Sequence, residues 1–435
     1  MLKIVHIITR LIVGGAQENT ILTCREQARL GHDVTLLAGP PEGPEGSLVD
    51  AARAAGIRTV LVPPLVRPVR PWHDLEAYAD LAKHLRDIRP DVVHTHSSKA
   101  GILGRLAARR TGAACIVHTI HGLPFDEYQG CAARWAYREA ERRAARWSHR
   151  LIAVSRDMAD RAAAAGLAPR GAVAVIYSGM DTERFRAAAG QREAVRQEWG
   201  AGPGDFVLLK VARLFHLKGH EFVLPAFAEV LRRCPRAMLV LAGGGILRPQ
   251  LEALAARLGA AARVRFIGLV PPERMPAVLW AADAVVHAGL REGLARVLPQ
   301  AGLCRRPAVA YDVGGAREVV RDGENGFLLA PPSPHDVARP ACPAVTVRRF
   351  SAPAPCGTAG LSGRGEAAPM LPTAGQAARG TAVCGSPAEA MERLASDPAA
   401  ACRMGERWPE EVLARFDYRP ATREIMRVYD SARGV

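Results

Sequence analysis

Three residues of this chain have the types and positions needed to bind and polarise an anionic ligand. Glu292 follows the apolar run 284–287 and precedes a glycine, and Arg213 follows the apolar run 206–212. Lys218 lies five positions beyond Arg213, at the expected start of a helix. An arginine and a lysine so placed can converge on one anion, with the helix dipole adding to their field. Because cations at a helix start are otherwise unfavourable, the pair indicates an anion site.

The elements expected to position these residues are short apolar strands that alternate with helices rich in alanine, leucine and arginine. Such alternation predicts parallel sheets covered by helices on both faces. Open sheets of this kind bind ligands beyond the carboxyl ends of their strands, which is where Arg213 and Glu292 are expected. The apolar runs cover residues 3–8, 33–38, 58–62, 91–94, 115–119, 150–154, 173–177, 206–212, 237–242, 264–270 and 284–287, with a further run that begins at 307.

Other strand ends carry glycines and histidines. Gly14 and Gly15 follow the first expected strand and precede a helical pattern, a geometry that lets backbone amides approach a phosphate or a sugar. A Gly-Gly pair alone is most often a tight turn. His94, His96 and His118 lie in or beside two further strand ends. For each of these histidines we favour a hydrogen-bonded side chain that ties loops together.

The length and composition of the chain fit a globular protein with two domains. With 435 residues, 49% of them hydrophobic, the chain is too long for a single core. It contains no run of about 18 uncharged apolar residues and no charged-then-apolar leader. The nine cysteines form no CxxC pair and no metal-ligand spacing, so free thiols in a reducing compartment are expected. We therefore expect a cytoplasmic protein without a metal site.

The net charge of +15 favours an anionic partner. Nucleic acid is disfavoured, because the chain has no basic stripe with interleaved aromatics, no zinc finger and no RNP-like motif. Basic clusters at 105–110 and 142–150 both lie in the first half and favour contact with an anionic membrane surface. We expect such contact to be peripheral, at the inner face of the cell membrane.

Taken in their order, these motifs resemble those of the retaining glycosyltransferases of family four, also called glycosyl transferases group one. The motifs that carry the resemblance are Glu292-Gly293-Leu294 with Gln300, Arg213 with Lys218, Thr119-Ile120-His121-Gly122, and the glycine loop Gly14-Gly15. A further motif, 175–185, matches with Ser178 in place of the usual asparagine, and here we favour Asp181 as the N-cap of the turn that follows. The resemblance covers about residues 1–335 and 386–435. It implies an α/β protein with the GT-B fold, in which two Rossmann-like parallel-sheet domains face each other across a cleft.

The resemblance also implies roles for site residues, with Glu292, His121, Arg213 and Lys218 as the catalytic candidates. Glu292 would contact the donor sugar, although an acidic residue before a helix is otherwise most often a plain cap. Arg213 and Lys218 would hold the donor diphosphate, and His121 would lie near the donor sugar. Gln300 stands where the family usually has a second glutamate facing the ribose, and an amide can still hydrogen-bond a ribose diol. The other donor-binding candidates are Gly14 and Gly15 in the glycine loop, Gly268 and Leu269 against the nucleotide base, and Gly293 and Leu294 through N–H groups at a helix start.

The implied activity is the transfer of a sugar from a nucleotide-sugar donor to a glycan or lipid-linked acceptor, with retention, in cell-surface glycan or glycolipid biosynthesis. Arg213 and Lys218 could neutralise the leaving diphosphate without a metal or other cofactor, and the chain has no Asp-x-Asp metal motif. Two alternatives stay open. One is a catalytically impaired protein that binds sugar nucleotides, suggested by Gln300 and by Gly244 in place of a common acidic residue. The other is an epimerase or phosphorylase with a GT-B-like fold.

The expected domain boundaries follow from composition. Residues 1–190 would form the acceptor-side domain, and the polar stretch 191–205 would be a linker. Residues 206–412 would form the nucleotide-sugar domain, and 413–435 a helix that packs back on the first domain. The stretch 336–385 is rich in Pro, Ala, Gly, Arg and Cys and shows neither helical nor strand periodicity. It predicts disorder, an insertion or a frameshift rather than part of a core.

Overall fold

The computed structural model describes residues 1–43, 45–333, 337 and 384–434. The stretch 336–385, for which the sequence predicts an insertion, disorder or a frameshift, lies almost wholly outside the described residues. The described parts of 1–331 and 382–435 belong to one compact unit, and only three residues of the second unit, 332–381, are described. The fold and the site below concern the first unit alone.

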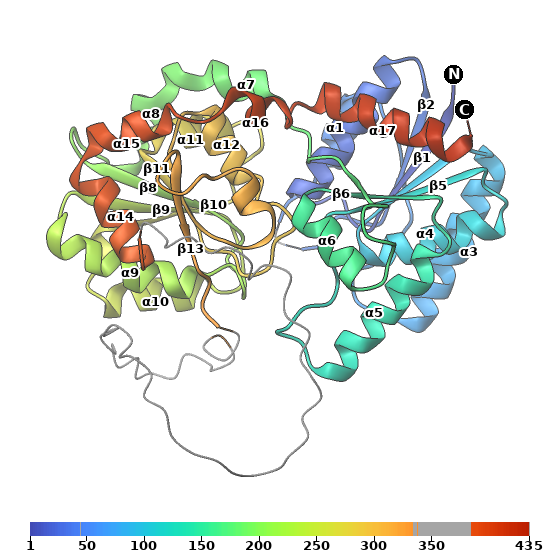
Figure 1. Ribbon diagram of the computed structural model, residues 1–435, viewed down its shortest axis with the longest axis horizontal. Coiled ribbons are helices and arrows are strands. Elements are labelled where there is room, and N and C mark those ends of the chain that lie inside the picture. The colour runs from blue at the N-terminus through green and yellow to red at the C-terminus, as the bar shows by residue number, and fades with distance from the viewer. Residues whose placement is uncertain (44, 334–336, 338–383, 435) are drawn as a thin grey trace, which may run out of the picture. The chain divides into compact units, whose positions relative to one another are not determined.

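The first half of the chain builds a sheet of seven parallel strands in the order β3-β2-β1-β4-β5-β6-β7 (Figure 1). The expected strand at 173–177 is reduced to two residues at the sheet edge, where it pairs only with β6. The strands are β1 Lys3–Ile8, β2 Asp33–Ala38, β3 Arg58–Leu61, β4 Val92–His96, β5 Cys115–Ile120, β6 Arg150–Ala153 and β7 Ala174–Val175.

Both faces of this sheet are buried, which explains why its strands are nearly continuous apolar runs. Side chains alternate between the faces, so Ile4 and Ile8 of β1 join one core cluster while Val5 and Ile7 join another. Helices α1, α2 and α17 cover the first face, and α3 and α4 cover the second. The helices of this half are α1 Gly15–Arg29, α2 Val49–Ala54, α3 Pro71–Ile88, α4 Ser98–Arg110, α5 Cys131–Ala145, α6 Arg156–Ala164 and α7 Thr182–Ala187, followed by the 3-10 turn η1 Ala188–Gln191.

The second half builds a six-stranded parallel sheet in the order β10-β9-β8-β11-β12-β13. Its edge strand β13 was not anticipated from the sequence. The strands are β8 Phe206–Val211, β9 Ala237–Ala242, β10 Val264–Gly268, β11 Ala284–His287, β12 Ala308–Tyr311 and β13 Gly326–Leu329.

The expected linker at 191–205 is not a plain linker, because it contains helix α8. Val195 and Trp199 of this helix are buried in the core cluster of the second sheet, and α8 packs on α11. The amphipathic spacing of these two residues within a polar stretch explains why composition alone concealed the helix. The helices of this half are α8 Arg192–Trp199, α9 His220–Arg233, α10 Arg248–Arg257, η2 Ala261–Arg263, α11 Met275–Ala281, α12 Val297–Leu303, η3 Gly314–Glu318, α14 Pro387–Ser396, α15 Pro398–Gly405, α16 Glu410–Ala414 and α17 Tyr418–Arg433.

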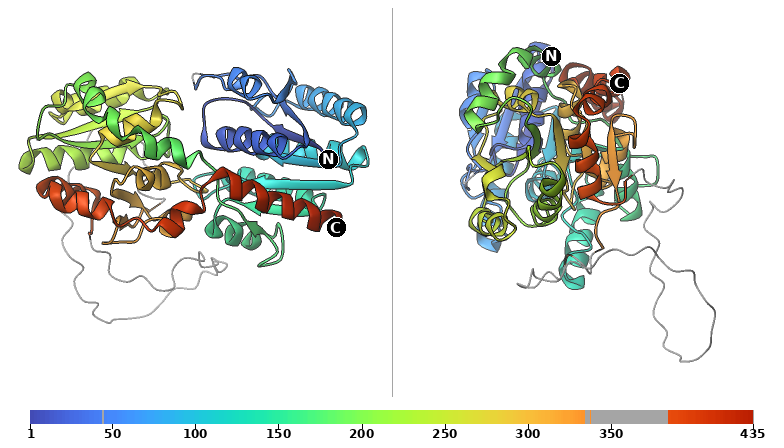
Figure 2. Two further views of the ribbon diagram at one scale, coloured as in Figure 1. Left: turned by 90° about the horizontal axis from the view of Figure 1, so that it is seen from above. Right: turned by 90° about the vertical axis from the view of Figure 1, so that its left-hand side faces the viewer.

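The last helix, α17, lies against elements of the first sheet, where it packs on α1 and β5 (Figure 2). Its buried side chains recur at helical spacing, with Tyr418, Ala421, Ile425 and Tyr429 on one face. Asp417 caps its start by accepting a hydrogen bond from the backbone N–H of Arg419. Among the described residues, no helix is long and apolar enough to cross a bilayer.

The two sheets have the same strand order, 3-2-1-4-5-6 from the first strand of each, with β7 added at one edge of the first sheet. The order reverses direction between β1 and β4 in the first sheet and between β8 and β11 in the second. Loops beyond the carboxyl ends of these central strands diverge at such a reversal and leave a crevice. The fold therefore predicts one ligand-binding position in each sheet.

Candidate active site

A cavity of about 730 Å³ is lined by the loops that follow central strands of both sheets. The loop after β1 contributes Gly14 and Gly15, and the loops after β8 and β11 contribute cations and a carboxylate. Ten of the eleven residues proposed from the sequence line this cavity, and Gly268 does not. The ten are Gly14, Gly15, His121, Arg213, Lys218, Leu269, Glu292, Gly293, Leu294 and Gln300.

An ion pair occupies the point where the second sheet reverses its order. Nζ of Lys218, which follows β8, donates to Oε1 of Glu292, which follows β11, at 2.6 Å. Nε2 of His287, the last residue of β11, lies 3.5 Å from the same oxygen. Burial opposes ionisation of Glu292, but the charge of Lys218 and the contact with His287 outweigh it and hold the pKa of Glu292 far below its usual range. Glu292 is therefore a carboxylate at neutral pH.

The structure excludes the alternative that Glu292 is the N-cap of a helix. Helix α12 begins at Val297, its N-cap position is Arg296, and no side chain caps it. The expectation that Gly293 and Leu294 stand at a helix start is wrong for the same reason. These residues lie in a loop, and the carbonyl oxygen of Gly293 accepts hydrogen bonds from Oγ of Ser155 and from the N–H of Gly315. The loop is thus fixed by contacts with other elements before the helix begins.

The Glu292 loop also lies directly against the His121 loop of the first sheet. A Cβ atom at Gly293 would overlap the carbonyl oxygen of His121, so only glycine allows this approach. His121 and Glu292 come from different sheets, and both line the cavity. The close backbone contact therefore brings the histidine and acidic candidates together without a direct side-chain bond.

Arg213 is held by a partner that the sequence did not suggest. Its Nη1 donates to Oε1 of Glu45 at 2.9 Å, and Nη2 of Arg10 lies 3.7 Å from that oxygen. The Glu45 side chain is only 4% exposed, and its Oε2 has no hydrogen-bond partner. Arg10, Glu45, Arg67 and Arg213 all line the cavity. A carboxylate of the protein therefore occupies an anion position between two arginines.

The glycine loop makes room for an arginine from the other half of the chain. Nη1 of Arg296 donates to the carbonyl oxygen of Gly15 at 2.5 Å and lies 3.4 Å from the carboxylate of Glu18. A Cβ atom at Gly15 would stand 2.7 Å from Cδ of Arg296, so a side chain there would displace the arginine. Gly14 precedes helix α1 and supplies no side-chain cap, which leaves the first N–H groups of the helix free of such a partner. The loop thus combines close packing with an uncapped helix start at the cavity.

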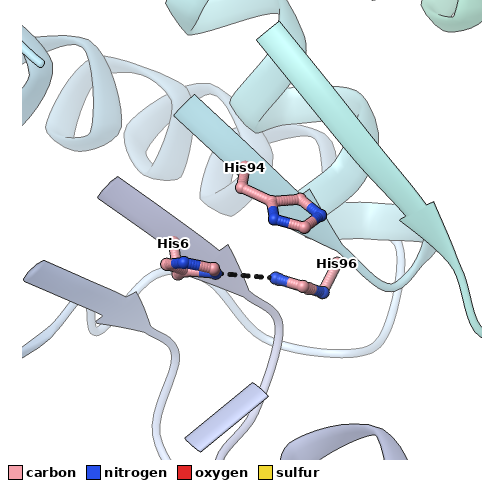
Figure 3. Close-up of side chains that lie close together, drawn as sticks. All are labelled: His6, His94 and His96. Atoms are coloured by element: carbon pink, nitrogen blue, oxygen red, sulfur yellow. Dashed lines mark hydrogen bonds between the residues drawn. The ribbon is translucent and has the colours of Figure 1, made fainter. Parts of the chain in front are cut away.

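A cluster of buried histidines lies beneath the corresponding position of the first sheet (Figure 3). His6 of β1 and His94 and His96 of β4 place one nitrogen each within 4.8 Å of one another, a geometry that could hold a metal ion. Each of their ring nitrogens, however, already has a hydrogen-bond partner in the protein. His118 likewise bonds to Thr95 at 2.9 Å. The prediction that His94, His96 and His118 are hydrogen-bonded is confirmed, but most of their bonds join strands and a helix, and only the bond from His96 to His121 reaches a loop.

Beneath the second sheet's reversal point lies a buried lysine. Lys210 of β8 is completely buried, and its Nζ has no hydrogen-bond partner. Burial lowers the pKa of Lys210 to about 7, against a smaller opposing effect of Glu221. Nδ1 of His220 and Oε2 of Glu221 also have no partner, and both groups are withdrawn from solvent.

Sequence reasoning found most of the cavity lining but missed several charged residues. Arg10, Glu45, Arg296 and Lys210 were not singled out. Arg296 and Arg10 stand within or beside quoted motifs, so their proximity to Glu292 and to the glycine loop was an available signal. Glu45 lies in a Pro- and Gly-rich loop that carries no motif, and its contact with Arg213 spans 168 positions. Asp181 was correctly predicted as an N-cap, because its carboxylate accepts from the N–H of Arg184.

Comparison with known proteins agrees with this fold. Residues 13–184 match the family described as Glycosyltransferase Family 4, and residues 191–340 match Glycosyl transferases group 1. The chain is 32% identical over 261 residues to EpsD of Bacillus subtilis (strain 168), a protein assigned by name to the glycosyltransferases, covering 59% of this chain and 68% of that protein. It is 27% identical over 330 residues, 75% of this chain and 84% of the other, to an Escherichia coli protein. That relative is named UDP-Gal:alpha-D-GlcNAc-diphosphoundecaprenol alpha-1,3-galactosyltransferase.

Among solved structures, Anabaena HepE in complex with UDP and glucose superposes with a TM-score of 0.74 at 20% identity, covering 99% of this chain and all of the other. At that identity the likeness establishes the fold alone. The two Rossmann-like parallel-sheet domains expected from the sequence are therefore confirmed as the GT-B architecture. On the evidence of its two matched regions and its similarity to EpsD, this chain belongs to the family-four, group 1 glycosyltransferases.

Proposed function

We propose that this protein transfers a sugar from a nucleoside-diphosphate sugar to an acceptor hydroxyl, with retention of the anomeric configuration and without a metal ion. The observation that supports this most directly is the ionised Glu292 bonded to Lys218, beside Arg213, at the order reversal of the second sheet. Such a position binds nucleotides in sheets of this topology. The E. coli relative, whose name includes a UDP-linked donor, makes a nucleotide sugar the expected substrate class.

The leaving group determines what the cations do. As the bond between the sugar C1 and the diphosphate oxygen breaks, negative charge grows on the phosphate. Lys218, Arg213 and Arg10 line the cavity and can neutralise that charge, as a divalent cation would in other transferases. Positive charge grows on the sugar ring at the same time, and the carboxylate of Glu292 stabilises it. Fixed charges that already face these positions lower the barrier because they need no reorganisation.

Retention then follows from attack on the face that the diphosphate leaves. The acceptor oxygen forms its bond to C1 on that face, and its proton passes to the departing phosphate oxygen. Glu292 is not proposed as a nucleophile, because attack on the face that the diphosphate leaves needs no enzyme nucleophile; its Oε1 is bonded to Lys218. His121 and the backbone of Gly293 and Leu294 would bind sugar hydroxyls. Gln300, buried in α12 and facing the cavity, would bind the ribose through its amide.

The experiment that tests this is a panel of nucleotide sugars, with release of the nucleoside diphosphate as the signal. One donor should support release and transfer, and both should persist in EDTA. NMR of the product should show the donor's anomeric configuration. Inversion of the anomer, or complete loss in EDTA with recovery on adding magnesium, would refute the corresponding part of the proposal. Tight binding without any turnover would instead favour an impaired sugar-nucleotide-binding protein.

A lipid-linked glycan is the acceptor class that the surface supports best. Residues 131–138, the first two turns of α5, are exposed throughout and include Trp135 and Tyr137. Trp72 and Leu75 are exposed in the first turns of α3. Helices α3 and α5 both flank α4 (Figure 1). Each follows a strand, so both begin at the edge of the sheet that bears the cavity.

Aromatic side chains among arginines are suited to a membrane interface. The expectation that Arg105 belongs to this basic surface is wrong, however. Arg105, counted in the basic cluster 105–110, is completely buried and bonds to Glu141 at 2.7 Å. Arg134 and Arg138 of α5 are exposed and can take its place.

Sedimentation with vesicles tests the surface. The protein should bind vesicles containing phosphatidylglycerol and not vesicles of phosphatidylcholine alone. Replacing Trp72 and Trp135 together with alanine should weaken binding several-fold, since each buries aromatic area at the interface. Ile246→Ala is the control, because Ile246 is 60% exposed but lies in the other half of the chain. Equal loss in the control would contradict the assignment of the surface to α3 and α5.

A further inference from the structure

The buried histidines of the first sheet form a continuous hydrogen-bonded chain that ends at the cavity. Nε2 of His121 lies 3.1 Å from Nδ1 of His96, and Nε2 of His96 lies 2.9 Å from Nδ1 of His6. Nε2 of His6 lies 2.7 Å from Oε1 of Gln27 on α1. His6 and His96 come from neighbouring strands, and their rings lie edge to edge with nearly parallel planes, joined through one nitrogen of each (Figure 3). The chain runs from the core of the domain to a residue that lines the candidate active site.

The pKa values of these rings decide whether each ring is charged or neutral. Burial lowers the pKa of His6 to about 4 and that of His96 well below its usual range. Burial and then the charge of Arg296 lower the pKa of His121 to about 4. Each ring is therefore neutral at physiological pH and carries one N–H donor and one acceptor nitrogen. In a chain of such rings, the protonation at one end determines which nitrogen is protonated at the other.

Gln27 determines which nitrogen of His6 carries the proton. Its Nε2 donates to the hydroxyl of Tyr429 at 3.2 Å and faces Sδ of Met426 at 3.6 Å, both on α17. Its Oε1 therefore faces His6 and can only accept, so His6 carries its proton on Nε2. His6 Nδ1 must then accept from Nε2 of His96, and His96 Nδ1 must accept from Nε2 of His121.

We propose that Gln27, oriented by Tyr429 and Met426 of α17, fixes His121 in the tautomer protonated on Nε2 through His6 and His96. Nδ1 of His121 then presents a lone pair to the cavity, where it accepts a hydrogen bond from a hydroxyl of a bound sugar. No described residue bonds to this nitrogen. Gln27, His6 and His96 are positioning residues, since they act through His121. The role for the sugar rests on the proposed function, but the tautomer itself does not.

His94 provides a matched control for His6. The two residues pair in register on neighbouring strands, and both are completely buried. Each has two hydrogen-bond partners, because His94 bonds to Tyr429 at 2.6 Å and to Thr119 at 2.7 Å. Replacing either with leucine leaves two polar groups unpaired, so a merely structural effect should be similar. Only His6 lies on the path from Gln27 to His121. His94 is hydrogen-bonded to that path only through Tyr429, and the Gln27 amide keeps its contact with Met426 when His94 is replaced.

NMR of ¹⁵N-histidine-labelled protein reads the tautomer directly, with the His121 signal identified by its loss in His121→Gln. The wild-type enzyme without ligand should show His121 protonated on Nε2. His6→Leu should yield a mixture of tautomers or protonation on Nδ1, and His94→Leu should leave the wild-type state. Protonation of wild-type His121 on Nδ1, or an unchanged tautomer in His6→Leu, would overturn the proposal. So would a stoichiometric metal ion bound by His6, His94 and His96 in the purified protein.

Kinetics supply the second measurement. His6→Leu should lower transfer about tenfold more than His94→Leu, the effect of one misdirected hydrogen bond to the sugar. Equal losses in the two variants would indicate a structural role only and would overturn the role at the sugar. If His6→Leu does not fold, Gln27→Leu interrupts the same path, and the wild-type tautomer remains decisive. A correct tautomer in a protein that transfers no sugar would refute the proposed function and leave the histidine chain intact.

Discussion

Two polar clusters lie beneath the cavity, each at the order reversal of its own sheet. They differ in how many of their polar atoms have a hydrogen-bond partner. In the first sheet, His6, His94 and His96 have partners for every ring nitrogen. In the second, Nζ of Lys210 and Nδ1 of His220 have none. A fully bonded network is rigid and neutral, whereas unpaired buried groups retain uncompensated charge or hydrogen-bonding capacity.

The difference shows that the same topology can support two kinds of chemistry. The histidine cluster of the first sheet offers neutral donors and acceptors suited to hydroxyl groups. The second offers Lys218, Arg213 and Glu292, whose charges suit a diphosphate and a developing cation. Strand order places both positions, but the side chains decide what each one binds. Changes in the second cluster should therefore affect charge stabilisation, and changes in the first should affect hydrogen-bond direction.

Removing both cations of the second sheet should have the largest effect. Arg213→Ala and Lys218→Ala should each lower turnover ~100-fold, because one preorganised partner of a developing anion is worth ~3 kcal/mol. The double variant should lose roughly 10⁴-fold if the two act independently. Both side chains lie at the cavity, so circular dichroism should show an intact fold, while the melting temperature measures the cost of leaving Glu45 and Glu292 without these partners. Steady-state rates of diphosphate release give the measurement.

The control for these cations is Arg248→Ala. Arg248 belongs to the same half of the chain, but it pairs with Glu252 on the surface of α10 and does not line the cavity. Its replacement should leave turnover unchanged. Near-normal transfer by the Arg213/Lys218 double variant would remove the diphosphate assignment from both residues.

Glu292→Gln should lower kcat by roughly ten- to a thousand-fold, the range expected for one electrostatic contact. Glutamine keeps the size and much of the hydrogen bonding but not the charge that stabilises the sugar ring in the transition state. The loss should fall on kcat more than on donor KM. Because the pKa of Glu292 is held far below its usual range, the wild-type rate should show no acidic limb from this group between about pH 5 and pH 8. An unchanged kcat with a lower melting temperature would make Glu292 structural.

The sequence predicted the fold more completely than the site, for physical reasons. Strands buried on both faces leave long apolar runs, so β1, β2 and β11 were found with the correct bounds. The edge strand β7 was predicted three residues too long, and the edge strand β13 was missed. Ten of eleven site residues line the cavity because motifs at strand ends share one edge of a parallel sheet.

Pairings between distant residues could not be found in this way. The contact of Arg213 with Glu45 joins the two halves of the chain, and no local pattern records it. The same is true of Gln27 with Tyr429, which lie 402 positions apart. Motifs report which residues stand at a sheet edge, whereas partner choice depends on how the loops pack in three dimensions.

Lys210→Met should stabilise the protein, because it removes a buried amine that has no hydrogen-bond partner. Replacing a histidine of the first cluster should instead destabilise it, since each ring nitrogen there has a partner. The folded-state pKa of Lys210 is about 7, whereas an unfolded lysine titrates near ~10.4, so the unfolded state binds more protons between these values. Wild-type stability should therefore rise with pH across that window. Methionine should gain roughly 1–4 kcal/mol at pH 7, as expected for replacing a buried charge, and the gain should shrink towards pH 10.

Chemical denaturation at several pH values measures this gain, with Lys83→Met as the control because Lys83 is exposed on α3. A pH-independent gain would show that packing rather than charge is responsible. Destabilisation at every pH would mean that Lys210 makes a stabilising interaction in the folded protein, and it would contradict the prediction.

Glu45→Gln should produce the smallest change, and it tests whether the anion position of the second sheet is occupied by the protein itself. Nη1 of Arg213 and Nη2 of Arg10 both face Oε1 of Glu45, so a donor diphosphate that uses Arg213 must compete with this carboxylate. Glutamine keeps the size and one acceptor oxygen but removes the competing charge. Solvent reaches the Arg213 side of this pair, where the side chain is 38% exposed, so the competing interaction is worth up to ~1 kcal/mol, and donor KM should fall about two- to fivefold with kcat nearly unchanged. Asp50→Asn is the matched control, since Asp50 pairs with Arg53 on the surface of α2 and does not line the cavity. A rise in donor KM in Glu45→Gln would show instead that Glu45 holds Arg213 in its productive position, and the charged cluster would then need the carboxylate as much as the histidine cluster needs Gln27.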